Sequence, residues 1–195
     1  TFIARLTVEE NKETRVATTV ETGRLLDLSL RDLGVEIVRG KVGDVNVAHL
    51  VQELSAAIGV EPVGVYIMPE AGYYPDSMFA TLTLLSRIRD VCQIREFFKD
   101  MPPLHLRQRK LQCPNHLKAM VMERVRENAR LFGASQLNTL DGLRLEFGNG
   151  WMLIRASGTE PVIRVLAEST SELETETLLS KGAQAVESVL EKVTV

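Results

Sequence analysis

The stretch Trp151-Met-Leu-Ile-Arg-Ala-Ser-Gly-Thr-Glu-Pro-Val-Ile-Arg-Val-Leu166 consists of two apolar runs around a short polar loop. Short runs rich in branched and aromatic residues that end at Gly or Pro are typical of strands. The pattern therefore predicts two strands, Trp151–Ile154 and Val162–Leu166. Because the loop joins their ends, we expect Arg155 and Arg164 to lie at the same end of one sheet.

The side chains of this loop suit a phosphate ligand. The guanidinium groups of Arg155 and Arg164 can each bind two phosphate oxygens, and the hydroxyls of Ser157 and Thr159 can donate further hydrogen bonds. We expect Gly158 to adopt a positive φ, which would turn successive backbone N–H groups toward an anion. The loop is therefore a candidate phosphate-binding site.

A polar hairpin is the alternative interpretation of the same residues. In that case the two arginines would pair with Glu160, Glu168 or solvent, as exposed arginines commonly do. The spacing of the residues alone favours neither interpretation.

The loop resembles the phosphate-binding signature that closes the α-D-phosphohexomutases, Arg-x-Ser-Gly-Thr-Glu-Pro-x-x-Arg, and every specified position is present. The segments Asp141-Gly-Leu-Arg-Leu and Gly150-Trp-Met-Leu-Ile-Arg155 are also similar to the final domain of that family. The resemblance implies that the loop clamps the phosphate that does not react. The residues implied are Arg155, Ser157, Gly158, Thr159 and Arg164.

The part of the chain before Asp100 alternates between strand-like and helix-like stretches. Such alternation implies parallel strands covered by helices, so we predict a three-layer α/β domain with a mixed sheet. The expected strands are Val16–Val20, Val35–Arg39 and Val63–Met68, and the expected helices are Leu25–Leu33, Val45–Ile58 ended by Gly59, and Ser77–Ile88 capped by Asp76.

A domain boundary is expected at Asp100-Met-Pro-Pro103, because two prolines cannot continue a helix. The prediction is an α/β domain over residues 1–101 and a smaller α+β domain with an antiparallel sheet over residues 102–195. The second domain is expected to hold a strand Leu104–Gln112, a helix Asn115–Phe132, short strands separated by Asp141-Gly142 and Gly148-Asn-Gly150, and a helix Ser171–Val193.

The first domain resembles the third domain of the same family. Its segment Val38-Arg-Gly-Lys-Val-Gly-Asp44 is similar to a Lys-Val-Gly-Asp loop whose lysine faces the substrate, which implies that role for Lys41. A plain strand-to-helix turn with Asp44 as N-cap is the alternative. Both hold if the cap fixes the loop while Lys41 points into the cleft.

The segment Val60-Glu-Pro-Val-Gly64 falls where the family has a sugar-binding loop, Gly-Glu-x-Ser-Gly. The resemblance implies that Glu61 contacts the sugar, since a carboxylate can accept hydrogen bonds from two adjacent hydroxyls. A solvated loop carboxylate is the alternative. The segment departs from the pattern, because Val60 replaces Gly, Val63 replaces Ser, and Val65 stands where many members have His. These changes leave the sugar open between mannose, glucose and glucosamine.

The composition argues against several classes of protein. The 195 residues carry a formal net charge of −3, which argues against a nucleic-acid partner, and no apolar run is long enough to span a membrane. The two cysteines, Cys92 and Cys113, fit neither a disulfide framework nor a four-ligand zinc site. We expect reduced thiols in a cytoplasmic protein.

The family's chemistry needs two parts that this sequence does not show. The resemblance implies a phosphorylated serine that transfers the phosphoryl group and an Asp-Gly-Asp-Gly-Asp loop that holds Mg²⁺, both in the first two domains of relatives. We therefore expect no catalytic residue and no metal ligand in this chain. His49, His105 and His116 are isolated in the sequence and are expected to be surface or packing residues.

The predicted function is that of the C-terminal half of a phosphohexomutase, with the N-terminal domains of the same protein as its partner. The whole enzyme would move a phosphoryl group between C1 and C6 of a hexose or hexosamine phosphate through a hexose 1,6-bisphosphate. This chain would clamp the phosphate and help to recognise the sugar. The alternative is a stand-alone module that binds a sugar phosphate and catalyses nothing. Thr1 as first residue favours the former, and the valines at positions 60, 63 and 65 favour the latter.

Overall fold

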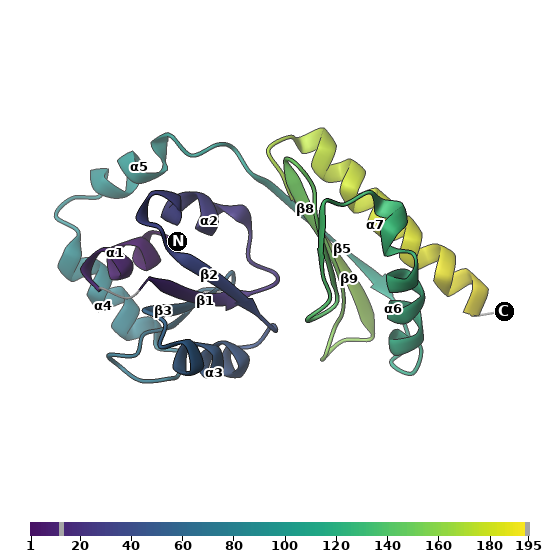
Figure 1. The fold of residues 1–195 in the computed structure, drawn as a ribbon, viewed down its shortest axis with the longest axis horizontal. Helices are drawn as coiled ribbons and strands as arrows, with labels where there is room; N and C mark the ends of the chain where they lie inside the picture. Colours follow the sequence, from purple (N-terminus) through teal and green to yellow (C-terminus); the bar gives the residue numbers. More distant parts are fainter. Residues whose placement is uncertain (12–13, 194–195) are drawn as a thin grey trace. The chain divides into compact units, whose positions relative to one another are not determined.

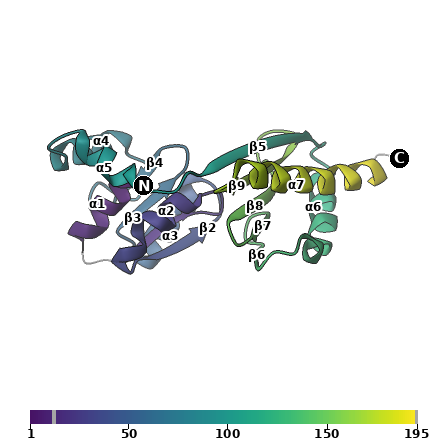
Figure 2. The same ribbon diagram turned by 90° about the horizontal axis from the view of Figure 1, so that it is seen from above.

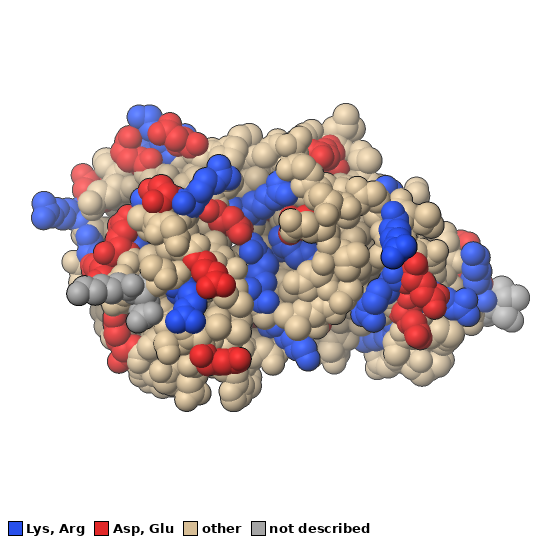
Figure 3. Space-filling view, viewed as in Figure 1, with Lys and Arg blue, Asp and Glu red and all other residues tan. Residues whose placement is uncertain are grey.

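The computed structural model describes residues 1–11 and 14–193. The chain folds as two compact units, Thr1–Pro102 and Pro103–Val195, each built on a sheet of its own (Figure 1). No helix within the described ranges is both long enough and apolar enough to cross a membrane. Acidic and basic side chains are interspersed over the face shown in Figure 3.

The first unit contains a four-stranded sheet in the order β2-β1-β3-β4. β1 pairs in parallel with both β2 and β3, where Val16 faces Ile37 and Ile58, whereas β4 runs antiparallel to β3. The three parallel strands therefore end at one edge of the sheet. The strands are β1 (Arg15–Thr19), β2 (Glu36–Gly40), β3 (Ile58–Glu61) and β4 (Val65–Ile67).

Helices cover both faces of this sheet (Figure 1). On one face, α1 (Phe2–Glu10), α2 (Arg24–Leu30) and α4 (Ser77–Arg87) bury apolar side chains. On the other face, α3 (Asp44–Leu54) packs alone. A 3₁₀ turn, η1 (Arg31–Leu33), extends α2 to Gly34, and α5 (Cys92–Lys99) contacts α1 through the rings of Phe97 and Phe2.

The helix expected over Val45–Ile58 is shorter, and the prediction that Gly59 ends it is wrong. α3 ends where Ser55 adopts a left-handed conformation with φ 49°. Ile58 and Gly59 already belong to β3, where they pair with β1. The helical spacing of Ile58 is accidental, because its side chain is buried by strand pairing and not by the helix.

The close packing of α3 on β3 explains the glycine at position 59. A Cβ at Gly59 would lie 2.6 Å from Val51 Cγ2 and 2.7 Å from Val47 Cγ1. Both valines are fully buried. Glycine at this position therefore reflects a contact between two elements, which a pattern within one element does not show.

The strand expected over Val63–Met68 is the second arm of a hairpin. β3 and β4 are joined by the turn Pro62–Gly64, in which the Gly64 N–H donates to the Glu61 carbonyl at 3.2 Å. Val63 lies in this turn and is 83% exposed. The turn is hard to recognise in the sequence, because Pro62 and Gly64 are interleaved with the valines at positions 60, 63 and 65.

The start of α4 is as predicted, since Asp76 Oδ1 accepts a hydrogen bond from the Phe79 N–H at 2.8 Å. The helix ends at Arg87, one residue before the expected Ile88. Neither α1 nor α5 is among the helices predicted from the sequence. α5 is only eight residues long and buries no side chain fully, so its apolar spacing extends over too short a stretch to identify it as a helix from the sequence.

The second unit contains a five-stranded antiparallel sheet in the order β5-β9-β8-β7-β6 (Figure 2). Two helices, α6 (Lys118–Glu127) and α7 (Glu172–Val193), pack on one face of it, and a 3₁₀ turn, η2 (Ala129–Phe132), follows α6. The predicted fold class, a three-layer α/β domain with a mixed sheet and then an α+β domain with an antiparallel sheet, is confirmed. The strands are β5 (His105–Gln112), β6 (Gln136–Asn138), β7 (Leu143–Glu146), β8 (Gly150–Ala156) and β9 (Val162–Ser169).

Candidate phosphate-binding site

Three cationic residues form a row across the second sheet. Arg155 on β8 is the direct cross-strand partner of Arg164 on β9, and Arg164 is also the partner of Lys110 on β5. Directly paired residues share one face of a sheet, so the row lies on a single face, beside the loop Ser157–Pro161. Lys110 is not among the residues predicted from the sequence, because a lysine in an exposed strand carries no signal until the strand register is known.

Carboxylates of the same unit hold these cations. Asp141 Oδ2 accepts from Arg155 Nε at 2.9 Å, and Glu160 accepts from Arg164 and, at 2.9 Å, from Lys110. Lys110, and after it Arg164, holds the pKa of the Glu160 carboxyl below its usual value. Ion pairs that are partly exposed contribute little, so a phosphate dianion can displace these carboxylates.

One contact of the polar-hairpin interpretation is present. Arg164 pairs with Glu160, as that interpretation expects. Glu168 accepts a hydrogen bond from Trp151 Nε1 at 2.8 Å. Arg155, on the other side of the loop, pairs with Asp141, which lies in the turn before β7. The arginines are thus held in place by carboxylates from two different loops.

Ser157 closes the backbone of the loop. Its N–H donates to the Val162 carbonyl at 3.0 Å, and its Oγ accepts from the N–H groups of Thr159 and Glu160 at 3.4 and 3.2 Å. The residue is 4% exposed. Because its oxygen accepts both of these bonds, its hydroxyl hydrogen remains to be donated to a ligand.

The positive φ expected at Gly158 is wrong. The described glycines with positive φ do not include Gly158, and the loop takes its shape from the hydrogen bonds of Ser157. A Cβ at Gly158 would meet no heavy atom within 4 Å. Neither the backbone nor the packing of this chain therefore requires glycine here. Its absence of a side chain keeps the outer side of the loop open.

A buried lysine lies under the loop. Lys118, the first residue of α6, is 9% exposed, and its ammonium group donates to the carbonyl of Ser157 at 2.7 Å and to that of Glu160. Nearby, the Cys113 N–H donates to the Pro161 carbonyl at 2.8 Å. Burial raises the pKa of the Cys113 thiol, against a smaller opposite effect of Lys118. No sequence signal links Lys118 to a loop that lies 39 residues away.

In the first unit, the two residues implied in sugar recognition lie at one edge of the sheet. Lys41 follows β2 and Glu61 ends β3, and the carboxyl ends of parallel strands are where open α/β sheets bind ligands. The Gly43 N–H donates to Glu61 Oε1 at 2.9 Å. This bond ties the loop of Lys41 to the carboxylate of Glu61.

The prediction that Asp44 is the N-cap of the next helix is wrong by one residue. The N-cap is Gly43, with φ 121°. Asp44 is the first residue of α3, and its Oδ1 accepts from the Val45 N–H at 2.8 Å. Its negative charge still favours the helix, because it lies at the positive end of the helix dipole.

The three valines that depart from the family pattern have different environments. Val60 is 5% exposed and belongs to the core between the sheet and α1, α2 and α4. Val63 is exposed in the turn after Glu61, where it offers no hydroxyl. Val65 is partly buried on β4. Val63 and Val65 therefore both change the chemistry near Glu61, since Val65 is the direct cross-strand partner of Glu61.

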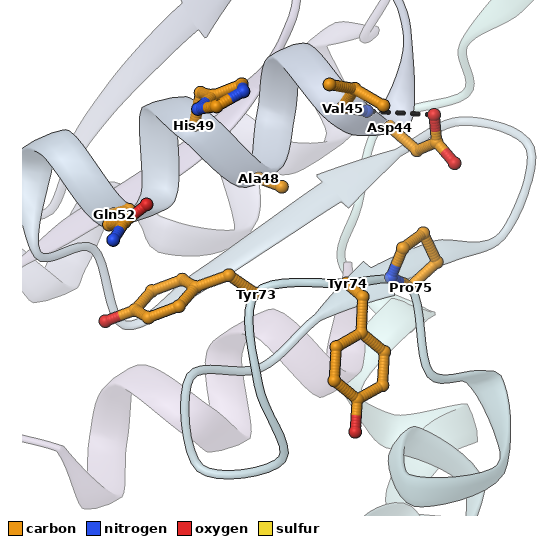
Figure 4. Close-up of a pocket in the computed structure, with 8 residues that line it drawn as sticks. All are labelled: Asp44, Val45, Ala48, His49, Gln52, Tyr73, Tyr74 and Pro75. Carbon is orange, nitrogen blue, oxygen red and sulfur yellow. Dashed lines mark hydrogen bonds between the residues drawn. The ribbon is translucent and has the colours of Figure 1, made fainter.

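A shallow hollow lies along α3, beginning at Asp44 and Val45 (Figure 4). It has a volume of about 200 Å³ and is lined by α3 and by the segment Tyr73–Pro75. Figure 4 shows Tyr73 across from Gln52 and Ala48, with Tyr74 pointing away from the helix. The hollow is smaller than the pockets of roughly 300–1,000 Å³ that usually hold small molecules, so we assign no ligand to it.

The arrangement of acidic, histidine and cysteine side chains bears on whether this part of the protein could hold a divalent metal. Residues 1–11 and 14–193 contain no group of three or more His, Cys, Asp or Glu side chains placed to share a metal ion. Mg²⁺ usually takes one or two carboxylates together with phosphate oxygens.

Family models identify the class of protein that this fold and loop define. Residues 1–103 match the model described as phosphoglucomutase/phosphomannomutase, alpha/beta/alpha domain III. Residues 110–185 match the model described as phosphoglucomutase/phosphomannomutase, C-terminal domain. The chain belongs to the phosphoglucomutase/phosphomannomutase family, of which it holds these two domains.

Two relatives with similar sequences are named as phosphoglucosamine mutases. A probable phosphoglucosamine mutase of Pyrococcus horikoshii is 36% identical over 190 residues, which are 97% of this chain and 42% of the relative. The phosphoglucosamine mutase of Methanocaldococcus jannaschii is 36% identical over 188 residues, which are 96% and 42% of the two chains. The chain therefore spans about two fifths of the length of these relatives.

Solved structures share the fold. A phosphoglucomutase/phosphomannomutase family protein from Burkholderia thailandensis has a TM-score of 0.80 at 24% identity, over 96% of this chain and 40% of that one. The N-acetylphosphoglucosamine mutase of Aspergillus fumigatus, solved in complex with GlcNAc-6P and magnesium, has a TM-score of 0.60 at 16% identity, over 94% and 44% of the two chains.

Proposed function

We propose that this chain is the phosphate-clamping and sugar-recognising part of a phosphoglucosamine mutase. The whole protein would move a phosphoryl group between C6 and C1 of glucosamine phosphate. The observation that carries the proposal is the row of Lys110, Arg164 and Arg155 beside an open loop. The choice of glucosamine among the hexoses is supported by the relatives, which are named phosphoglucosamine mutases.

The clamp would work by exchange of one anion for another. In the free chain, Glu160 and Asp141 neutralise the cations. A phosphate monoester carries nearly two negative charges at neutral pH and offers three oxygens, so it binds Arg155 and Arg164 more strongly than either carboxylate does. The Ser157 and Thr159 hydroxyls would add donors. The phosphate held here is the one that does not react.

The sugar would be recognised by the first unit. Glu61 Oε1 is taken by the Gly43 N–H, and its second carboxylate oxygen has no donor among the described residues, so it can accept from a sugar hydroxyl. Lys41 is exposed in the loop that this hydrogen bond ties to Glu61, and it can attract a phosphate. Because Val63 supplies no hydroxyl, the sugar would have one contact fewer than the family pattern provides.

In the proposed reaction, a phosphoserine outside this chain gives its phosphoryl group to the free hydroxyl of the substrate. The product is glucosamine 1,6-bisphosphate and a free serine. The bisphosphate then turns in the site and returns its other phosphoryl group to the serine. Mg²⁺ would be held by carboxylates outside this chain. The clamp contributes by fixing the reacting oxygen in a near-attack position, with binding energy from the remote phosphate.

The second candidate is a module that binds a sugar phosphate without catalysis. The exposed Val63, where the family pattern has Ser, is the observation that favours it. The two candidates differ in the activity of the longest natural form of the protein. Interconversion of glucosamine 6-phosphate and glucosamine 1-phosphate by that form would support the mutase, and binding without interconversion would support the module.

The binding part of the proposal is tested by calorimetric titration of the chain with glucosamine 6-phosphate and glucose 1-phosphate. Loss of a charge-assisted contact costs about 1.5–3 kcal/mol, or roughly tenfold and more in affinity. We therefore expect Arg155→Ala and Arg164→Ala each to weaken binding of glucosamine 6-phosphate at least tenfold. Arg109→Ala is the matched control, because Arg109 lies opposite Val165 on the helix-covered face of the sheet. Equal affinities of all four proteins would refute the clamp.

A further inference from the structure

The environment of Lys118 is unusual for a charged side chain. It is 9% exposed, and within the described residues no carboxylate pairs with its ammonium group. A buried ion without a counter-ion is costly to maintain. A methionine could fill the same space without that cost, so the charge itself calls for an explanation.

The two acceptors of Lys118 are both backbone carbonyls of the loop. They belong to Ser157 and Glu160, the residues on either side of Gly158 and Thr159. One ammonium group therefore holds both sides of the turn. The Glu160 carbonyl also accepts from the Val162 N–H at 2.8 Å. Cutting the contact with Lys118 would therefore chiefly free the Ser157 carbonyl, whose printed donor is Lys118.

The direction of the Ser157 carbonyl fixes the direction of the next N–H group. The described chain contains no cis peptide bond, and in a trans peptide the C=O and the following N–H point in opposite directions. With the Ser157 oxygen on Lys118, the Gly158 N–H points to the outer side of the loop. No described residue accepts a hydrogen bond from it, and the space above Gly158 is open.

The positive charge of Lys118, like the outward Gly158 N–H, favours an anion on the outer side of the loop. It lies on the inner side of the loop, opposite the side where the Gly158 N–H emerges. An anion bound to that N–H would be attracted through the thickness of one peptide chain, in surroundings less polarisable than water. The attraction is proportional to the charge of the anion, so a dianion gains twice as much as a monoanion.

We propose that Lys118 is a positioning residue of the phosphate loop: it holds the carbonyls of Ser157 and Glu160, turns the Gly158 N–H outward and places a positive charge behind the bound phosphate. The inference rests on the proposed function, since it assigns a role in binding at the same loop. It adds a residue that does not touch the ligand and that belongs to a different element, α6.

The test compares two ligands of different charge. The phosphate group of glucosamine 6-phosphate carries nearly two negative charges at pH 7.5, whereas the sulfate group of glucosamine 6-sulfate has a similar shape and carries one. If the Lys118→Met variant loses about tenfold in affinity for the phosphate, a charge effect predicts a loss of only about threefold for the sulfate, the square root of ten. Lys118→Arg keeps the charge and is expected to bind the phosphate within threefold of the unmodified chain.

Lys181→Met is the matched control. Lys181 also donates to a backbone carbonyl, that of Phe132 at 2.8 Å, away from the loop. This variant should lose thermal stability but keep its affinity for both ligands. If Lys118→Met fails to fold, Lys118→Gln takes its place, because an amide can still donate to the carbonyls but carries no charge. The same selective loss for the dianion is then expected.

The outcomes separate this inference from the proposed function. Equal losses for the phosphate and the sulfate would show that Lys118 acts only by holding the loop, and would overturn the positive charge that the inference places behind the bound phosphate. A Lys118→Met variant that binds as the unmodified chain does, while Arg164→Ala loses binding, would overturn the whole inference; the clamp would then stand without Lys118. Two results would overturn the clamp and the inference together. One is no binding of either ligand by the unmodified chain, and the other is binding that neither Arg155→Ala nor Arg164→Ala weakens.

Discussion

The substitution Gly59→Ala tests the packing of α3 on the first sheet. The added methyl carbon would lie 2.6 Å from Val51 and 2.7 Å from Val47, closer than carbon atoms can approach. Both valines are fully buried and are fixed in rotamer by their branched Cβ atoms. Neither can swing away, so the helix has to move off the strand.

The size of the effect follows from two opposing contributions. Overpacking a well-packed core by one methyl group costs about 1–3 kcal/mol. Alanine also restricts the unfolded chain more than glycine, which stabilises the folded state by about 0.4–1 kcal/mol where the native backbone suits it. We therefore expect Gly59→Ala to lower the free energy of unfolding by roughly 1–2 kcal/mol.

The assay is urea unfolding followed by far-ultraviolet circular dichroism. Gly148→Ala is the control, since a Cβ at Gly148 meets nothing within 4 Å and its φ is not positive; it should stay within about 0.5 kcal/mol of the unmodified chain. A double variant locates the clash. Val51→Ala alone should cost about 2 kcal/mol, and combined with Gly59→Ala it should cost about 1 kcal/mol less than the sum. Strict additivity, or a neutral Gly59→Ala, would refute the reasoning.

Three further results are expected. Iodoacetamide at pH 7.5 should modify the exposed Cys92 and spare Cys113, whose thiol is buried and has a raised pKa; mass spectrometry of the folded chain showing equal modification would contradict this. Asp76→Ala should cost about 1 kcal/mol of stability, because it removes the N-cap of α4, whereas Asp76→Asn should cost less; equal urea midpoints for both variants would contradict the cap. The pKa of Glu160 should rise in Lys110→Met, because Lys110 is the main cause of its low value. With its folded pKa below the unfolded value of about 4.3, Glu160 stabilises the fold fully above that pH and loses this contribution as the pH falls through the folded pKa. Carbon-13 NMR titration of the Glu160 carboxyl group measures its pKa in the unmodified chain and in Lys110→Met. An unchanged pKa in the variant would contradict the prediction.

Much of the site was within reach of the sequence. The loop signature gave Arg155 and Arg164, and the structure pairs them directly across β8 and β9. Lys41 and Glu61 were reached through resemblance, and the structure joins their loops by one hydrogen bond. These residues could be found because each lies in a short segment with its own recognisable pattern.

The residues that the sequence analysis missed act across elements. Lys110 joins the cationic row only through the register of β5 against β9, and Lys118 reaches the loop from α6. The positive φ expected at Gly158 failed for a related reason. The loop is shaped by Ser157 and Lys118, which bind its backbone from inside, so glycine serves to leave open space there.

The sequence by itself determined the family, the fold class, the position of the candidate phosphate loop and the cap at Asp76, because short-range spacing and local hydrogen bonding carry that information. The tertiary structure decided where α3 ends, why residue 59 is glycine, and which cations surround the loop. These features depend on distances between residues far apart in the chain, such as Gly59 to Val51 across the α3–β3 contact. Such distances are set by packing and strand register, and no periodicity within a single segment encodes them.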